Sequence, residues 1–115
     1  MTPREKAKIF AVALDGKMAQ DIKILEVTEL TILADYFIIA TAASTTHLKT
    51  LADFCEMELK NLGELPGHIE GHSSGSWILL DYGSVVVHLF LQEARSFYSL
   101  ERLWADSKQW KEEDL

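Results

Sequence analysis

The stretch from Trp77 to Leu91 limits the possible folds most, because two runs of strand-forming residues flank the turn Gly83-Ser84. A two-residue hairpin loop fixes which residues lie opposite each other on two antiparallel strands. The predicted pairs are Tyr82/Val85, Asp81/Val86, Leu80/Val87, Leu79/His88, Ile78/Leu89 and Trp77/Phe90. The sequence therefore predicts a β-hairpin with one definite register.

This register gives the hairpin two different faces, because side chains alternate across a strand. The first face is uniformly apolar and carries Ile78, Leu80, Val85, Val87 and Leu89. The second face carries Trp77, Leu79, Asp81, Val86, His88 and Phe90. The first composition is typical of a core. The second combines large aromatic residues with an acid and an imidazole, which is more typical of a recognition surface.

One domain is expected from the length of 115 residues, of which 48% are hydrophobic. No apolar run approaches the roughly 20 residues that span a membrane, and the N-terminus lacks the apolar segment of a signal peptide. The single cysteine, Cys55, excludes an internal disulfide and agrees with a reducing compartment. We therefore expect a cytoplasmic protein without membrane contact.

The formal net charge of -7 indicates the kind of partner. Direct binding to nucleic acid is not expected, because such binding depends on Lys and Arg side chains that neutralise phosphates. An acidic surface favours a basic protein instead and makes the rate of association sensitive to salt.

The N-terminal half predicts a helix, two strands and a second helix. Thr2, Pro3 and Glu5 form a capping-box signature, and a helix follows that ends near Asp15-Gly16. Strands are predicted over Ile22–Val27 and Asp35–Ala42, the latter in a central position because both of its faces are apolar.

Ser44 is expected to cap the second helix, and Gly63 occupies the position typical of a helix C′ glycine. Its apolar stripe is formed by Leu48, Leu51, Ala52, Cys55, Leu59 and Leu62. This stripe predicts that the helix covers one face of the sheet.

The rest of the chain predicts a short edge strand over Gly67–His72, a loop over Glu93–Tyr98 and a helix over Leu100–Trp104 capped by Ser99. The charged residues 111–114 are expected to fray. The fold class is thus α/β, a single domain with a mixed sheet of about five strands and helices mainly on one face. Two helices cannot cover both faces, so the face with Trp77, Leu79 and Phe90 is a candidate exposed patch.

Several blocks of the chain resemble the ribosomal silencing factor family, also called the Iojap-related family. These blocks are Asp35–Thr41, Glu70-Gly71, Trp77–Gly83, Val85–Phe90, Arg95–Tyr98 and Leu100–Trp104. The resemblance covers residues 1–106 as the family domain and leaves residues 107–115 as a charged tail. Ala42, Thr46 and Ser84 depart from the family pattern, which usually has glycine, arginine and aspartate there.

The resemblance implies a nucleotidyltransferase-like fold without catalysis and without a cofactor. It implies binding to the large ribosomal subunit through ribosomal protein fourteen, which blocks the small subunit from joining and represses translation. Organellar relatives act in large-subunit assembly. Several members form homodimers, which gives a third interpretation, that the same face is a homodimer interface. The implied docking residues are Trp77, Leu79, Asp81, His88, Phe90, Arg95 and Tyr98.

Two other functions, catalysis on a nucleotide and metal binding, would need particular residues of this chain. A nucleotide-binding enzyme would use Gly83-Ser84 as a phosphate cradle, but this turn joins two strands, whereas such cradles begin a helix. Its paired carboxylates, Glu56 and Glu58, point apart on a helix. A metal site would use His68, Glu70 and His72, but the flanking glycines and the surface position favour a solvated edge strand instead. His88 is either a hydrogen-bonded structural histidine or an interface residue.

Overall fold

The computed structural model describes residues 1–115, and a mixed sheet of six strands forms its centre. Along the chain the elements are α1 (Pro3–Gly16), β1 (Gln20–Glu26), β2 (Tyr36–Ala42), α2 (Thr45–Asn61), β3 (His68–Glu70), β4 (Trp77–Asp81), β5 (Val85–Leu91), α3 (Gln92–Tyr98), α4 (Leu100–Leu103), β6 (Lys108–Trp110) and a 3-10 helix η1 (Glu112–Asp114). The strand order is β3-β4-β5-β2-β1-β6. Only β2 and β5 run parallel; the other pairs are antiparallel. The α/β class and the mixed sheet are confirmed.

The predicted hairpin is confirmed in every pair from Trp77/Phe90 to Asp81/Val86. The Tyr82 amide donates to the Val85 carbonyl at 2.9 Å, which closes the turn. Gly83 adopts a φ of 77°, a left-handed conformation that glycine enters without steric cost. The turn chemistry and the alternation of side chains were therefore sufficient to predict the register.

The C-terminal segment corrects two expectations. Residues 108–110 form the sixth strand, β6, which pairs Trp110 with Ile24 of β1. Residues 111–114 do not fray, because the segment is tied to α1: Arg4 donates to the Asp114 carbonyl and Lys8 to the Glu112 carbonyl, each at 2.6 Å. The residues that fix this tail lie about a hundred positions away in the sequence, so local patterns gave no sign of them.

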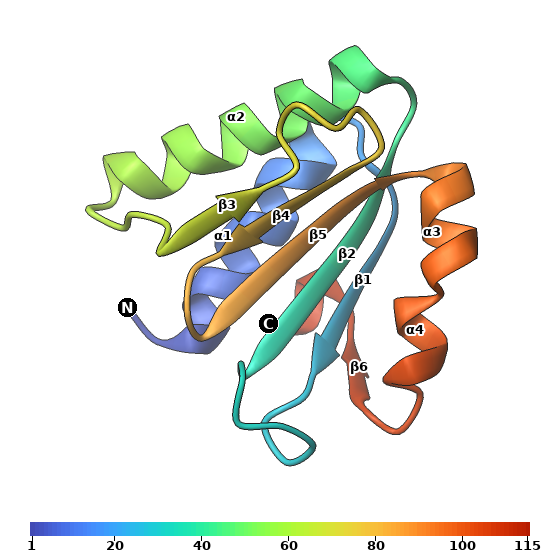
Figure 1. Cartoon of the computed structure of the whole chain (residues 1–115). Helices are drawn as coiled ribbons and strands as arrows, with labels where there is room; N and C mark the ends of the chain where they lie inside the picture. Colours follow the sequence, from blue (N-terminus) through green and yellow to red (C-terminus); the bar gives the residue numbers. More distant parts are fainter.

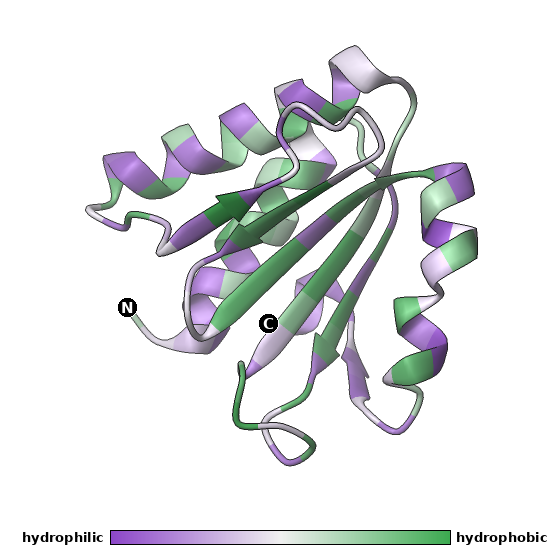
Figure 2. Cartoon of the chain, in the orientation of Figure 1, coloured by the Kyte–Doolittle hydropathy of each residue, from purple (hydrophilic) through white to green (hydrophobic).

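One face of the sheet, here called the helical face, is covered by α1 and α2 (Figure 1). Both helices begin and end as predicted: Thr2 and Glu5 form a capping box with bonds of 3.1 Å, and Gly63 follows α2 at a φ of 82°. Leu62 is the exception in the predicted stripe. It is exposed, because α2 ends one residue before it. Figure 2 shows the central strands as largely hydrophobic and both helices as mixed, as expected for helices that bury one side.

The other face of the sheet is covered only in part, by α3 and α4 (Figure 1). Its buried core is small and consists of Leu25, Val27, Ala34, Phe37, Ile39, Val86 and Phe90. The predicted loop over Glu93–Tyr98 is wrong, since residues 92–98 are helical. Ser99 joins the two short helices in a left-handed conformation, and it makes no side-chain cap to α4. No helix in the structure has the length and apolar character that crossing a membrane requires.

Candidate functional site

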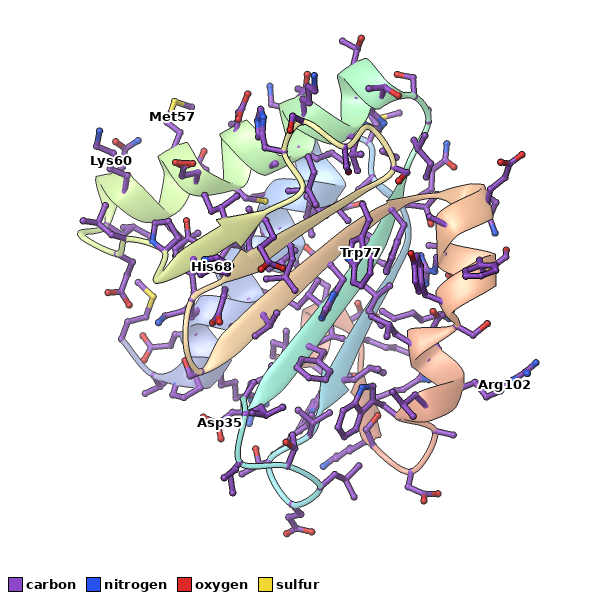
Figure 3. The ribbon with its side chains drawn as sticks, viewed as in Figure 1. Asp35, Met57, Lys60, His68, Trp77 and Arg102 are labelled. Atoms are coloured by element: carbon purple, nitrogen blue, oxygen red, sulfur yellow. The ribbon has the colours of Figure 1, made fainter.

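Aromatic side chains gather on the partly covered face, where β4, β5 and α3 meet. Trp77 stacks on Phe90 with ring centroids 5.1 Å apart, and the Tyr98 ring lies 4.6 Å from the Trp77 ring. Phe97 packs edge-on against Tyr98 at 5.2 Å. We call Trp77, Leu79, Phe97 and Tyr98 the aromatic face; Figure 3 shows Trp77 on the front of the sheet beside α3. These contacts join the hairpin to a helix that the sequence did not predict.

The structure brings Trp77, Phe90 and Tyr98 together, whereas Asp81 lies at the turn end of the hairpin, where its carboxylate accepts from the Gly83 amide. The predicted docking residues are also not equally exposed. Tyr98 is 49% exposed, while Trp77, Leu79 and Asp81 are half-buried. Phe90, His88 and Arg95 are buried. The expectation of an uncovered hairpin face is therefore wrong for Phe90, because α3 adds a layer of side chains above it.

Two exposed apolar residues of this surface are not among the seven docking residues named above, although the segment Arg95–Tyr98, which contains Phe97, adjoins the docking face that the resemblance implies. Phe97 on α3 is 81% exposed and Leu103 on α4 is 71% exposed. Leu103 lies in the predicted helix over Leu100–Trp104, and Phe97 lies in the segment predicted as a loop. An exposed phenylalanine beside an exposed tyrosine enlarges the apolar area available to a partner.

Arg95 holds the partial cover in place. Its Nη1 donates to the Asp21 carbonyl at 2.6 Å and to the Thr41 hydroxyl at 2.8 Å, and its Nε donates to Glu101 at 3.3 Å. Nη2 lies 3.4 Å from the Asp21 carboxylate. One guanidinium thus links α3 to α4 and to the ends of β1 and β2. With only 3% of its surface exposed, Arg95 supports the aromatic face from beneath.

His88 lies among rings, with the Phe37 centroid at 5.4 Å and the Trp77 centroid at 6.0 Å. Burial lowers the pKa of His88 to about 4, so the ring is neutral at pH 7. Its Nδ1 and the Trp77 indole nitrogen are buried without a partner in the protein. His88 was interpreted as either a hydrogen-bonded structural residue or an interface residue. The structure shows no hydrogen bond at Nδ1 that would support the first interpretation.

A groove of ≈ 290 Å³ opens beside Trp77 and is here called the Trp77 groove. It is lined by Glu70, Gly71, Ser74, Ser76, Trp77, Leu79 and Tyr98. Gly71 has a φ of 79°, and a Cβ at this position would clash with the Trp77 carbonyl oxygen. Glycine is thus required for the β3–β4 connection to pass close to Trp77 and form one wall of the groove.

The residues considered for catalysis and metal binding do not converge. Gly83-Ser84 joins β4 to β5, and Glu56 and Glu58 lie on α2. His68 bonds to Glu70 at 2.7 Å, whereas His72 bonds to Asp53 of α2 at 2.8 Å. No group of three His, Cys, Asp or Glu side chains is placed to hold a metal ion.

A larger groove of ≈ 600 Å³ between α1 and α2 has Glu58 as its one carboxylate. Burial raises the pKa of the Cys55 thiol to about 12, as expected for a packing residue.

The family described as "Ribosomal silencing factor during starvation" matches residues 1–115 of the chain. The chain belongs to this family. It is 36% identical over 107 residues to the ribosomal silencing factor RsfS of Bacillus subtilis strain 168, covering 93% of this chain and 91% of that protein. Membership implies ribosome-associated regulation of translation, and the family is not a known enzyme family.

Two further similarities extend the comparison with the silencing factor family. A crystal structure of a protein from Chromobacterium violaceum superposes with a TM-score of 0.89 at 38% identity, covering 91% of this chain and 88% of that one. The mouse protein named "Mitochondrial assembly of ribosomal large subunit protein 1" is 36% identical over 89 residues, which cover 75% of this chain and 39% of the mouse protein.

The three departures from the family pattern lie away from the aromatic face. Ala42 is buried in the core of the helical face, and Thr46 is exposed in the first turn of α2. Ser84 lies in the hairpin turn, where its carbonyl accepts bonds from the Asp35 and Tyr36 amides at 2.8 and 3.0 Å. The Ser84 side chain is not needed for these bonds.

Proposed function

We propose that this protein binds the large ribosomal subunit through ribosomal protein fourteen and sterically prevents the small subunit from joining. The observation that carries the proposal is the aromatic face, a cluster of partly exposed rings on the one face of the sheet that the long helices leave open. Aromatic residues of this kind dominate binding energy at protein interfaces. Family membership supports a ribosomal partner.

The aromatic face is suited to docking because it is already ordered. Trp77 rests on buried Phe90, and buried Arg95 fixes the helix that carries Phe97 and Tyr98. A surface that is rigid before binding loses less conformational entropy when the complex forms. The net charge of -7 supports a basic partner and predicts that higher salt slows association.

The proposed mechanism is occlusion, so repression follows occupancy of the large subunit and needs no turnover. The expected place of action is the cytoplasm, where a bacterial-type silencing factor meets ribosomes. A role in subunit assembly is the alternative, supported by the printed name of the mouse relative. Both roles require binding to the large subunit, and only silencing requires that joining be blocked.

Sedimentation through a sucrose gradient tests the proposal. Purified protein is mixed separately with isolated large and small subunits, and the complementary subunit is then added to measure joining. Co-migration with the large subunit together with reduced joining is expected. Binding without reduced joining would favour assembly, and no binding to either subunit would refute the ribosomal role. Sedimentation equilibrium of the free protein shows whether self-association through the same face competes.

A further inference from the structure

We propose that the Trp77 groove receives an arginine side chain of the protein partner, with the Glu70 carboxylate as its counter-charge. The inference rests on the proposed function, since it requires that the aromatic face meets a protein. It adds to the proposed function the identity of one partner side chain and of the carboxylate that binds it. The prediction of docking residues did not include Glu70.

The sheet register places Glu70 on the aromatic side. Glu70 of β3 lies directly opposite Leu79 of β4, and His68 lies opposite Asp81. Directly opposed residues of antiparallel strands project to the same face. Glu70 therefore places a carboxylate on this side of the sheet, where it lines the groove together with Leu79 and Trp77.

The composition of the groove fits a cation with a flat, weakly hydrated head. Two rings, Trp77 and Tyr98, and one carboxylate, Glu70, line it, and none of its lining residues is basic. A cation over an aromatic ring is stabilised by the ring quadrupole, and a carboxylate at the rim adds a charge-assisted bond. The volume of ≈ 290 Å³ lies just below the range of about 300–1,000 Å³ typical of small-molecule sites, so one side chain suits it better than a cofactor.

Glu70 is oriented for such a contact. His68 Nε2 lies 2.7 Å from Glu70 Oε1, a hydrogen bond that holds the carboxylate and leaves Oε2 free to accept. Trp77 is held by its stacking on Phe90. Arginine matches this arrangement better than lysine does, because its planar guanidinium stacks on rings while its edge binds a carboxylate.

An NMR titration of the free protein tests the groove without ribosomes. The Trp77 indole resonance is assigned with Trp77→Phe, and the probes are the capped tripeptide Gly-Arg-Gly and its citrulline counterpart, which is neutral but nearly the same shape. We expect the arginine peptide to shift the Trp77 indole signal, with at least fivefold weaker binding of the citrulline peptide and loss of this preference in Glu70→Gln. Equal binding of both peptides, no shift with either, or an unchanged preference in Glu70→Gln would overturn the inference.

A second measurement separates this inference from the proposed function. Affinity for the large subunit is compared between Glu70→Gln and the matched control Glu113→Gln, an exposed glutamate of η1. We expect about a tenfold loss of affinity in Glu70→Gln alone, with a weaker dependence on salt. If the wild-type protein binds and both variants bind equally well, the inference fails while the proposed function stands. If the wild-type protein does not bind, the proposed function fails, and the peptide titration alone decides what the groove prefers.

Discussion

The helical face and the aromatic face belong to the same sheet, yet they are completed in different ways. On the helical face, two long helices enclose a core in which Phe10 packs edge-on against Tyr82 at 4.9 Å, with both rings buried. On the aromatic face, two short helices bury Phe90 but leave Phe97 and Tyr98 open. The difference indicates that the two faces have different roles. The helical face supplies most of the stability, and the aromatic face keeps apolar side chains exposed for a partner.

Phe10→Ala tests the stabilising role of the helical face and has the largest expected effect. It should lower the free energy of unfolding by about 3–5 kcal/mol, because it opens a cavity in a packed core. Phe97→Ala, the matched change on the aromatic face, should alter it by less than about 0.5 kcal/mol. Urea denaturation measures both. Similar losses in the two variants would contradict the division between the faces.

Arg95→Met tests how the partial cover is held. We expect the free energy of unfolding to fall by about 3 kcal/mol, because the substitution breaks a buried ion pair. This value is at the lower end of the range for such pairs, since the Asp21 carboxylate can return to solvent. Hydrogen exchange should rise in α3 and α4 before it rises in the central strands. Arg102→Met, at the outward-pointing arginine of α4 in Figure 3, is the control. Equal exchange in the two variants would refute a supporting role for Arg95.

Much of the fold could be predicted from the sequence because its signals are local. The turn Gly83-Ser84, the capping box at Thr2 and the glycine after α2 each act within a few residues. The cover on the aromatic face depends on distant contacts instead. α3 has only seven residues and no side-chain cap, and its Arg95 bonds to residues 54 and 74 positions away. The burial of Phe90 followed from these contacts and was therefore missed.

His88 makes the stability of the aromatic side depend on pH. Burial lowers the pKa of folded His88 from 6.5 to about 4, so between these values the unfolded chain binds a proton that the folded chain does not. The free energy of unfolding should therefore fall as the pH drops from 6.5 to 4, by about 3 kcal/mol in total. Urea denaturation of the wild type and of His88→Leu across this pH range separates the contribution of His88 from that of the carboxylates. If the free energy of unfolding changes with pH by the same slope in the wild type and in His88→Leu, the prediction is contradicted. His68→Gln, at an exposed histidine, serves as the control.

Trp77→Ala tests the docking role of the aromatic face. Affinity for the large subunit should fall about thirtyfold, or about 2 kcal/mol. Leu62→Ala, at an exposed leucine beside α2, should bind like the wild type. Circular dichroism checks that both variants are folded, and Tyr98→Ala repeats the test at a more exposed ring. Wild-type affinity in a folded Trp77→Ala variant would remove Trp77 from the interface.

Hydroxyl-radical footprinting of the protein, free and bound to the large subunit, tests the central claim most directly. The aromatic face predicts that oxidation of Trp77, Phe97 and Tyr98 falls on binding. Met57, which points outward from α2 in Figure 3, should stay as reactive as in the free protein, and so should Leu62. Protection of Met57 and Leu62 with unchanged oxidation of Phe97 and Tyr98 would show that the helical face docks instead.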